Sequence, residues 1–199
     1  MTSPLGGGAG ADRSVRPARD ADVPAIGAVH ARSWTGPYAS LLPPRVVEAL
    51  GAAALAEAWR DAVLAPPSPA HTVHVAVGDG IVAGFAAAAP VPDDPAAVEL
   101  VALEVDPLHT RQGHGSRLLA AVADTSRARG VERLEAWVHV DDAPRRAFLQ
   151  GAGFAPDGAR RRRALAGGDG TGDDSTRDDD VDARTVWPEV RLSAWLEPA

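Results

Sequence analysis

The chain has 199 residues, of which 45% are hydrophobic and 24% charged, which suits one globular domain with its own core. It contains no cysteine, which excludes a disulfide framework, a thiolate zinc site and a cysteine nucleophile, and is typical of a reducing compartment; we therefore predict a cytoplasmic protein. The net charge of −7 argues against nucleic acid as a partner. No apolar stretch approaches the roughly 18 residues of a membrane span, so no membrane partner is expected.

Two segments have compositions that oppose folding. Residues 1–14 are predicted to be a disordered leader, because 1–11 are mostly small residues and proline and lack the charged start and apolar core of a signal peptide. Residues 167–182 are rich in Gly, Asp, Ser and Thr and cannot bury enough apolar surface to become ordered. We therefore predict one domain over 15–199, interrupted by a disordered acidic loop at about 167–182.

The first predicted elements are a strand and two helices. Residues 15–17 read as a short strand, and Asp20 or Asp22 caps a helix with apolar residues at helical spacing. A second helix is predicted over about 45–64, ending at the prolines that begin with Pro66. The elements that follow are a hairpin over 72–89 turning at 78–80, a strand over 98–105, a helix over 113–129, a strand over 134–140, a helix over about 142–150, and a final antiparallel pair from Phe154 onward and over 189–195.

The strongest local feature is a strand, a short turn and a glycine pair that opens a helix. The turn reads Arg111-Gln112-Gly113-His114-Gly115-Ser116. Its two glycines leave backbone N–H groups uncovered at the positive end of a helix dipole, where a phosphate can bind. A Walker loop is excluded because the chain has no lysine, and a Rossmann fingerprint needs a third glycine. Taken alone, the glycine pair fits an ordinary turn before a helix equally well.

With its surroundings, this segment resembles the GNAT family, the Gcn5-related N-acetyltransferases. Residues 15–22 resemble the family's opening strand and helix, and 30–34 and 41–43 are similar to stretches frequent in its bacterial members. Residues 99–116 resemble its acetyl-CoA motif, and 137–154 the strand and helix that follow. The resemblance implies an α/β fold with a central, mixed and mostly antiparallel sheet of about seven strands, flanked by about four helices.

The resemblance also implies acetyl-CoA as a co-substrate, with no metal. It implies contacts of the Leu103 and Val105 backbone with the acetyl and pantetheine part, a role for Asp142 where the family often has Asn, and pyrophosphate binding by the amides of Arg111, Gln112, Gly113, His114, Gly115 and Ser116.

Two positions depart from the family pattern. Thr110 replaces a Gln or Arg, which weakens phosphate binding, and Leu149 replaces a tyrosine that in many members protonates the departing thiolate.

Three residues are candidates for catalysis. Acetyl transfer needs a neutral amine, and deprotonating an alkylamine of pKa about 10.4 costs about 4.6 kcal/mol at pH 7. Glu99 matches by position a strand glutamate that is the base in some members, although a salt-bridge role fits as well. Glu104, charged within a central strand, faces either the acceptor cleft or an edge loop. His139 titrates in the right range, although a lone histidine is more often structural.

Trp34 and Tyr38, between the first two helices, are the candidate acceptor-binding residues, with core packing as the alternative for each. No histidine spacing suggests a metal site.

The predicted function is an N-acetyltransferase that moves an acetyl group from acetyl-CoA to a primary amine of a small molecule or peptide by direct attack in a ternary complex. The alternatives are a non-catalytic acyl-CoA-binding regulatory module and an interaction protein with a vestigial site. A homodimer through the last strands is compatible with the resemblance.

Overall fold

The computed structural model describes residues 13–36, 50–164 and 186–197, together with 39, 42, 46 and 47. The predicted disordered segments, 1–14 and 167–182, lie outside these residues except for Arg13 and Ser14. Tyr38 also lies outside them, so its predicted role in acceptor binding stays a prediction.

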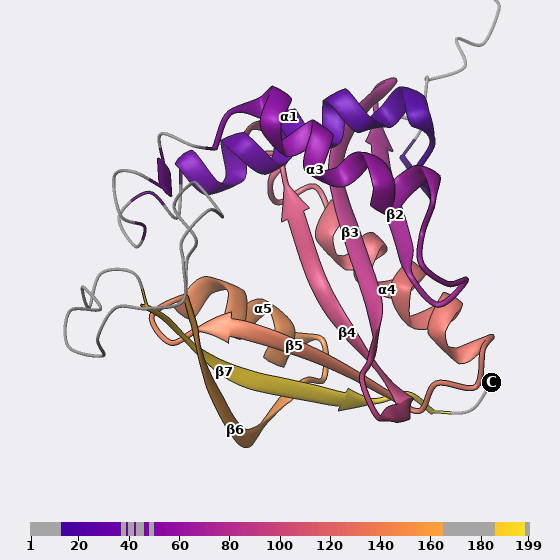
Figure 1. Ribbon diagram of the computed structural model, residues 1–199, viewed down its shortest axis with the longest axis vertical. Helices are drawn as coiled ribbons and strands as arrows, with labels where there is room; N and C mark the ends of the chain where they lie inside the picture. The colour runs from indigo at the N-terminus through magenta and orange to yellow at the C-terminus, as the bar shows by residue number, and fades with distance from the viewer. Residues whose placement is uncertain are drawn as a thin grey trace, which may run out of the picture.

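A seven-stranded sheet runs through the molecule in the order β1-β2-β3-β4-β5-β7-β6 (Figure 1). All neighbouring strands are antiparallel except β4 and β5, which are parallel. The strands are β1 (Ser14–Pro17), β2 (Thr72–Gly78), β3 (Ile81–Val91), β4 (Asp94–Val105), β5 (Arg133–His139), β6 (Ala155–Ala164) and β7 (Val186–Trp195). The predicted mixed, mostly antiparallel sheet of about seven strands is confirmed.

In the described part of the chain, four α-helices flank the sheet: α1 (Val23–Thr35), α3 (Ala52–Leu64), α4 (His114–Arg127) and α5 (Ala143–Gly151). Two short 3-10 turns, η1 (Asp20–Asp22) and η2 (Pro107–His109), precede α1 and α4. Ile26 and Val29 of α1 pack with Phe85 on one face, and Leu118 of α4 packs with Leu149 of α5 on the other. Each such side chain, when fully buried, contributes about 1.5–3 kcal/mol.

The sheet forks between β4 and β5. These two strands pair only through Ala97–Glu99 and Arg133–Glu135. Beyond this point β4 stays paired with β3 and β5 with β7, so the two strands separate, as Figure 1 shows. From Leu100 onward, one edge of the β4 backbone has no neighbouring strand among the described residues, so its N–H and C=O groups can make other contacts.

The prediction of one continuous second helix is wrong. The expected helix over 45–64 is interrupted at Leu50 and Gly51, which are not helical, and α3 begins at Ala52. Gly51 is the residue before the first helical one and has an extended backbone, with φ −68° and ψ 136°. The apolar spacing continues through this break, which is why periodicity alone did not reveal it.

Helices α1 and α3 approach each other closely at Gly27. A Cβ atom there would overlap the carbonyl oxygen of Ala52 and the backbone of Ala56. We expect Gly27→Ala to lower the free energy of unfolding by about 1–3 kcal/mol, because the two helices must move apart. Thermal unfolding measures this as a fall of about 2–4 °C per kcal/mol. Gly151→Ala is the matched control, because a Cβ at the end of α5 meets nothing within 4 Å; equal losses in the two variants would contradict the steric argument.

Candidate active site

The glycine turn forms a cradle of free amides at the start of α4. Gly113 precedes the helix with a left-handed backbone, φ 78°, and no side chain caps the helix. The amides of His114, Gly115 and Ser116 lie in the first turn, where N–H groups have no partner within the helix. Arg111 also has a positive φ, 62°. This backbone arrangement is suited to an anion such as a pyrophosphate.

The cradle lies beside the end of β4. A Cβ at Gly115 would be 3.5 Å from the ring of Phe148 on α5 and 3.7 Å from the side chain of Val105. These are ordinary contact distances, so the site leaves room for a methyl group and little more. The cradle, the last residue of β4 and helix α5 therefore border the same small region.

Three side chains around the cradle already have contacts within the protein. Arg117 donates to the carbonyl oxygen of Gln112 at 3.2 Å, which brings a guanidinium next to the turn. The Thr110 hydroxyl donates to the carbonyl of Pro107 at 3.3 Å. His114 can offer only its amide, because its side chain is buried toward Gly78 of β2, and this burial lowers its pKa.

Arg145 of α5 spans the opening of the fork. Its guanidinium donates to the Leu103 carbonyl at 3.2 Å and to the Glu104 carboxylate at 2.7 Å, both on β4. Asp142 caps α5 by accepting from the amide of Arg145 at 3.0 Å. The predicted cofactor residues Leu103 and Asp142 thus lie on opposite sides of the fork. Sequence reasoning missed the arginine that joins them.

Leu149 is 1% exposed and belongs to the main core cluster. Together with Leu103 and Arg145 it lines a narrow cavity inside the fork. The position where many family members carry a tyrosine therefore presents only hydrocarbon.

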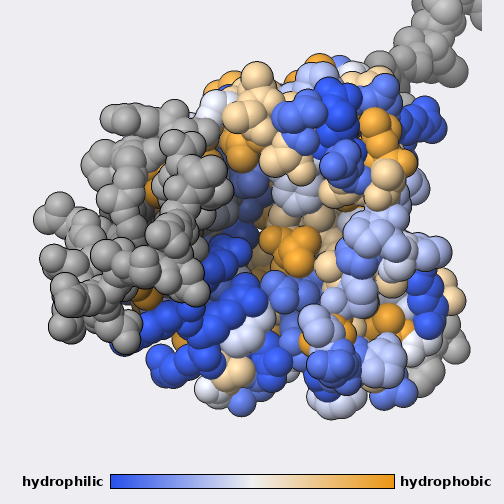
Figure 2. Space-filling view, viewed as in Figure 1, coloured by the Kyte–Doolittle hydropathy of each residue, from blue (hydrophilic) through white to orange (hydrophobic). Residues whose placement is uncertain are grey.

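A cavity of about 300 Å³ opens on the α1 side of the sheet. Figure 2 shows this face hollowed near its middle, with an apolar floor and hydrophilic side chains along the lower rim. All three candidate catalytic residues, Glu99, Glu104 and His139, line the cavity together with Trp34. The fold thus brings these four residues to one place, although they come from β4, β5 and α1.

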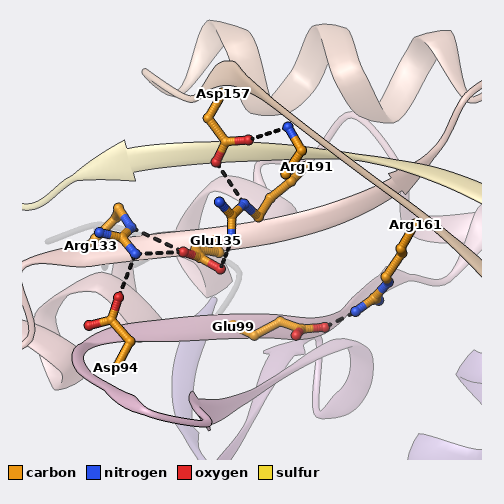
Figure 3. A network of polar contacts seen from close by, with 8 residues as sticks. Asp94, Glu99, Arg133, Glu135, Asp157, Arg161 and Arg191 are labelled. Carbon is orange, nitrogen blue, oxygen red and sulfur yellow. Dashed lines mark hydrogen bonds and ion pairs between the residues drawn. The ribbon is translucent and has the colours of Figure 1, made fainter.

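The three candidate bases differ in how firmly they are held. Glu104 is 3% exposed and accepts from Arg145 and from the Trp34 indole at 3.3 Å. His139 accepts the Asp141 amide N–H at Nδ1, 3.2 Å away, so its proton resides on Nε2. The Glu99 side chain is 24% exposed, and its carboxylate accepts a hydrogen bond from the Arg161 guanidinium at 3.4 Å (Figure 3). Glu99 is therefore the more exposed of the two candidate carboxylates in the cavity.

Sequence reasoning missed several residues of this cavity. Trp59 donates its indole N–H to Nδ1 of His30 at 2.9 Å, and burial lowers the pKa of His30, so the ring is neutral and carries its proton on Nε2. Trp187 stacks on Trp34 with ring centroids 6.0 Å apart, and its centroid lies 4.1 Å from that of His139. The period-two alternation that places Trp187 and Glu189 on one face of β7 was a usable signal.

A network of ion pairs holds the closed end of the fork (Figure 3). Glu135 of β5 is buried and accepts from Arg133 at 2.8 Å and from Arg191 of β7 at 3.0 Å. Arg133 also binds Asp94 of β4, and Arg191 binds Asp157 of β6, each at 2.7 Å. The network thus ties four strands together where β4 and β5 meet. Because Glu135 has two arginine partners, its buried charge stays paired when one of them is removed, and only loss of both would leave it unpaired, which is strongly destabilising.

Within the described ranges, no three His, Cys, Asp or Glu side chains gather in a way that could hold a metal ion. None of the helices in these ranges is both long and apolar enough to cross a membrane.

A mixed seven-stranded sheet with an amide cradle beside the end of β4 is the arrangement that the resemblance to GNAT proteins implies. The family model described as "Acetyltransferase (GNAT) family" matches residues 34–154, more than half of the chain. The chain belongs to this family. Its α/β fold matches solved members as well, as the following comparisons show.

A mycothiol acetyltransferase from Thermomonospora curvata is 38% identical over 120 residues. The match covers 59% of this chain and only 38% of that relative's length. Among solved structures, paia N-acetyltransferase from Thermoplasma acidophilum in complex with coenzyme A has a TM-score of 0.69 at 16% identity, covering 92% of this chain and 99% of the other. The yncA protein of Salmonella typhimurium with its cofactor acetyl-CoA has a TM-score of 0.61 at 18% identity, covering 94% and 95%. At these identities the two structures are evidence for the fold.

Stability should fall between pH 7 and pH 5. Burial lowers the pKa of His30, His74 and His114, whereas the unfolded chain has histidines of pKa about 6.5. The unfolded state therefore binds more protons as the pH falls, and each histidine removes at most about 1.4 kcal/mol per pH unit. Urea unfolding at several pH values measures the slope, and His74→Gln should reduce it.

Asp22→Asn is the control for this titration. The hydrogen bond from Arg16 lowers the pKa of Asp22, so that the stability it contributes is present above its unfolded pKa of about 3.9 and is lost only at more acidic pH. The variant should lower stability equally at pH 7 and pH 5. A slope that is unchanged by His74→Gln, or one that disappears in Asp22→Asn, would contradict the assignment to buried histidines.

Proposed function

We propose that this chain is an N-acetyltransferase that transfers an acetyl group from acetyl-CoA to a primary amine of a small molecule or peptide, by direct attack in a ternary complex. The observation that carries the proposal is the placement of the amide cradle and the fork next to a cavity that contains Glu99. Together they provide a phosphate site, an unpaired strand edge and an available carboxylate within one region.

The residues present fit acetyl-CoA. The amides of His114, Gly115 and Ser116 suit its pyrophosphate, with the Arg117 guanidinium close by. The free edge of β4 at Leu103 and Val105 suits the amide groups of pantetheine. Acetyl-CoA would supply an activated thioester. A β4 amide near Leu103 could donate to its carbonyl oxygen, where negative charge develops during attack.

Glu99 is proposed as the general base, acting directly or through water. Glu104 is less suited, because Arg145 and Trp34 both donate to its carboxylate. His139 is less suited, because the ring nitrogen without a proton already accepts an amide N–H. We assign these two residues to shaping the cavity, and Trp34 to its acceptor-binding wall.

The alternative function, a non-catalytic acyl-CoA-binding module, is favoured by one observation. The buried side chain of Leu149 offers no proton to a leaving thiolate. Turnover with any amine separates the two functions.

The remaining features of the proposal rest on the sequence. A cytoplasmic location is supported by the absence of cysteine, and the lack of a nucleic-acid partner by the net charge of −7. The homodimer and the independence from metal stay predictions.

Acetyl-CoA should stabilise the protein through the cradle. At about 100 times its dissociation constant it should add about 2.7 kcal/mol, which raises the Tm by roughly 5–10 °C. Gly115→Glu should abolish the rise by placing a carboxylate among the amides. Gly115→Ala should keep it, because its methyl group fits at ordinary contact distance. A full rise in Gly115→Glu would mean that the cofactor binds elsewhere.

Glu99→Gln should lower kcat/KM at pH 7 by about 10²–10⁴-fold, because the amine must then lose its proton unaided. The thermal shift with acetyl-CoA should be retained, and the rate should recover toward pH 10 as alkylamines become neutral. Glu57→Gln, on the exposed face of α3, is the matched control and should behave like the parent. Unchanged kinetics in Glu99→Gln would remove Glu99 from the mechanism.

A further inference from the structure

Four of the five tryptophans of the chain line the cavity: Trp34, Trp59, Trp137 and Trp187. They come from α1, α3, β5 and β7, so they meet only in the folded protein. The fifth, Trp195, is 70% exposed and lies outside the cavity. Indole rings present broad, flat apolar surfaces that favour aromatic ligands and attract cations over their faces. Arg161 already lies over the Trp137 ring, 4.3 Å from its centroid, so it is the rings of Trp34, Trp59 and Trp187 that suit a flat body and a positive charge.

The charges of the cavity also select for a cation. Its lining contains four carboxylates and three guanidiniums, which leaves one excess negative charge when the histidines are neutral. The charged residues are Glu99, Glu104, Asp142, Glu189, Arg145, Arg161 and Arg163. An ammonium ion would restore the balance.

A ligand that also carries a carboxylate would find no arginine without a partner among those that line the cavity. Each arginine already has a carboxylate partner: Arg145 pairs with Glu104, and Arg161 and Arg163 both pair with Glu189. The carboxylate of an amino acid would have to compete with these contacts. Two of these guanidiniums are shared, since Arg161 pairs with Glu99 and Glu189, and Arg145 pairs with Glu104 and Asp142. Of these four carboxylates Glu99 has the most exposed side chain, 24%, so it is the one that a bound ammonium group reaches most easily.

We propose that the acceptor is an arylalkylamine, a primary amine on a short chain that ends in a flat aromatic body, with no carboxylate beside the nitrogen. The proposal rests on the proposed N-acetyltransferase function and specifies its substrate class. A cavity of about 300 Å³ suits a small molecule of this size.

The transfer balances as follows. The amine nitrogen forms a bond with the acetyl carbon, and the C–S bond breaks with its electron pair on sulfur. Of the two protons that leave the ammonium nitrogen, one passes through Glu99 to solvent and the other ends on the thiolate. The product amide is neutral and loses its attraction to Glu99, which favours its release.

The first experiment compares acceptors on the full chain with acetyl-CoA, by following thiol release. The probes are tryptamine, tryptophan, tryptophanamide and glucosamine. We expect kcat/KM for tryptamine to exceed that for tryptophan and glucosamine at least about 10-fold, with tryptophanamide between tryptamine and tryptophan. Amine basicity alone favours the opposite order, since an α-amine loses its proton more readily than an alkylamine. Equal use of tryptophan or glucosamine would overturn the proposal.

The second experiment tests the tryptophan wall. Trp34→Leu should raise the KM for tryptamine at least about 5-fold while the thermal shift with acetyl-CoA stays as in the parent. Trp195→Leu is the matched control and should leave the KM for tryptamine unchanged, because that ring lies outside the cavity. An equal effect in the two variants, or none in Trp34→Leu, would overturn the proposal.

Failure of the enzyme function is distinguishable from failure of this inference. If acetyl-CoA binds but no amine is acetylated, the N-acetyltransferase function is wrong. Calorimetric titration of tryptamine and tryptophan in the presence of coenzyme A then decides the ligand class on its own. Tighter binding of tryptamine, weakened by Trp34→Leu, supports the proposal, and equal binding of the two probes contradicts it.

Discussion

The site depends on the short parallel pairing between β4 and β5. Only three residues on each strand are in register, from Ala97 to Glu99 and from Arg133 to Glu135. Complete pairing would close the sheet and occupy the backbone edge at Leu103. The pairing stops because β4 continues with β3 and β5 continues with β7 in directions that separate. The ion pairs around Glu135 fix the closed end, and Arg145 spans the open end.

The features that could be predicted are those with local causes. The cradle follows from two glycines at the start of an amphipathic helix, and the alternation of β4 places a central strand before it. Glu99 and Glu104 show the limit of this reasoning, because five residues apart they would face opposite sides of a regular strand. A bulge places Val101 between the pairs Ala87–Ala102 and Ala88–Leu100, so both carboxylates reach the same cavity. The sequence contains no visible sign of this bulge.

The features that were missed have partners far away in the chain. Arg161 lies in a run of four arginines, a pattern typical of a solvent-exposed segment, yet its guanidinium lies 4.3 Å from the centroid of the Trp137 ring and binds Glu189. Arg145 is one of two adjacent arginines in α5, and only the position of β4 makes it the residue that spans the fork. The alternation of Trp187 and Glu189 predicts that they share a face of β7, but nothing near them in the chain indicates the cavity that this face lines. Such roles are set by tertiary packing, which composition and periodicity do not encode.

The magnitudes explain how a GNAT site can function with Leu149 in place of a tyrosine. At pH 7, protonating a leaving thiolate of pKa about 8.5 gains only about 2 kcal/mol, whereas deprotonating an alkylamine of pKa about 10.4 costs about 4.6 kcal/mol. The base therefore addresses the larger part of the barrier, and the acid the smaller. In this protein the residue at the position of the acid, Leu149, has a buried hydrocarbon side chain. Glu99 is partly exposed and lies where β4 and β5 diverge. If Glu99 is the base, as we propose, the site lowers the barrier mainly by activating the amine, and the acceptor's own charge becomes the main determinant of both binding and rate.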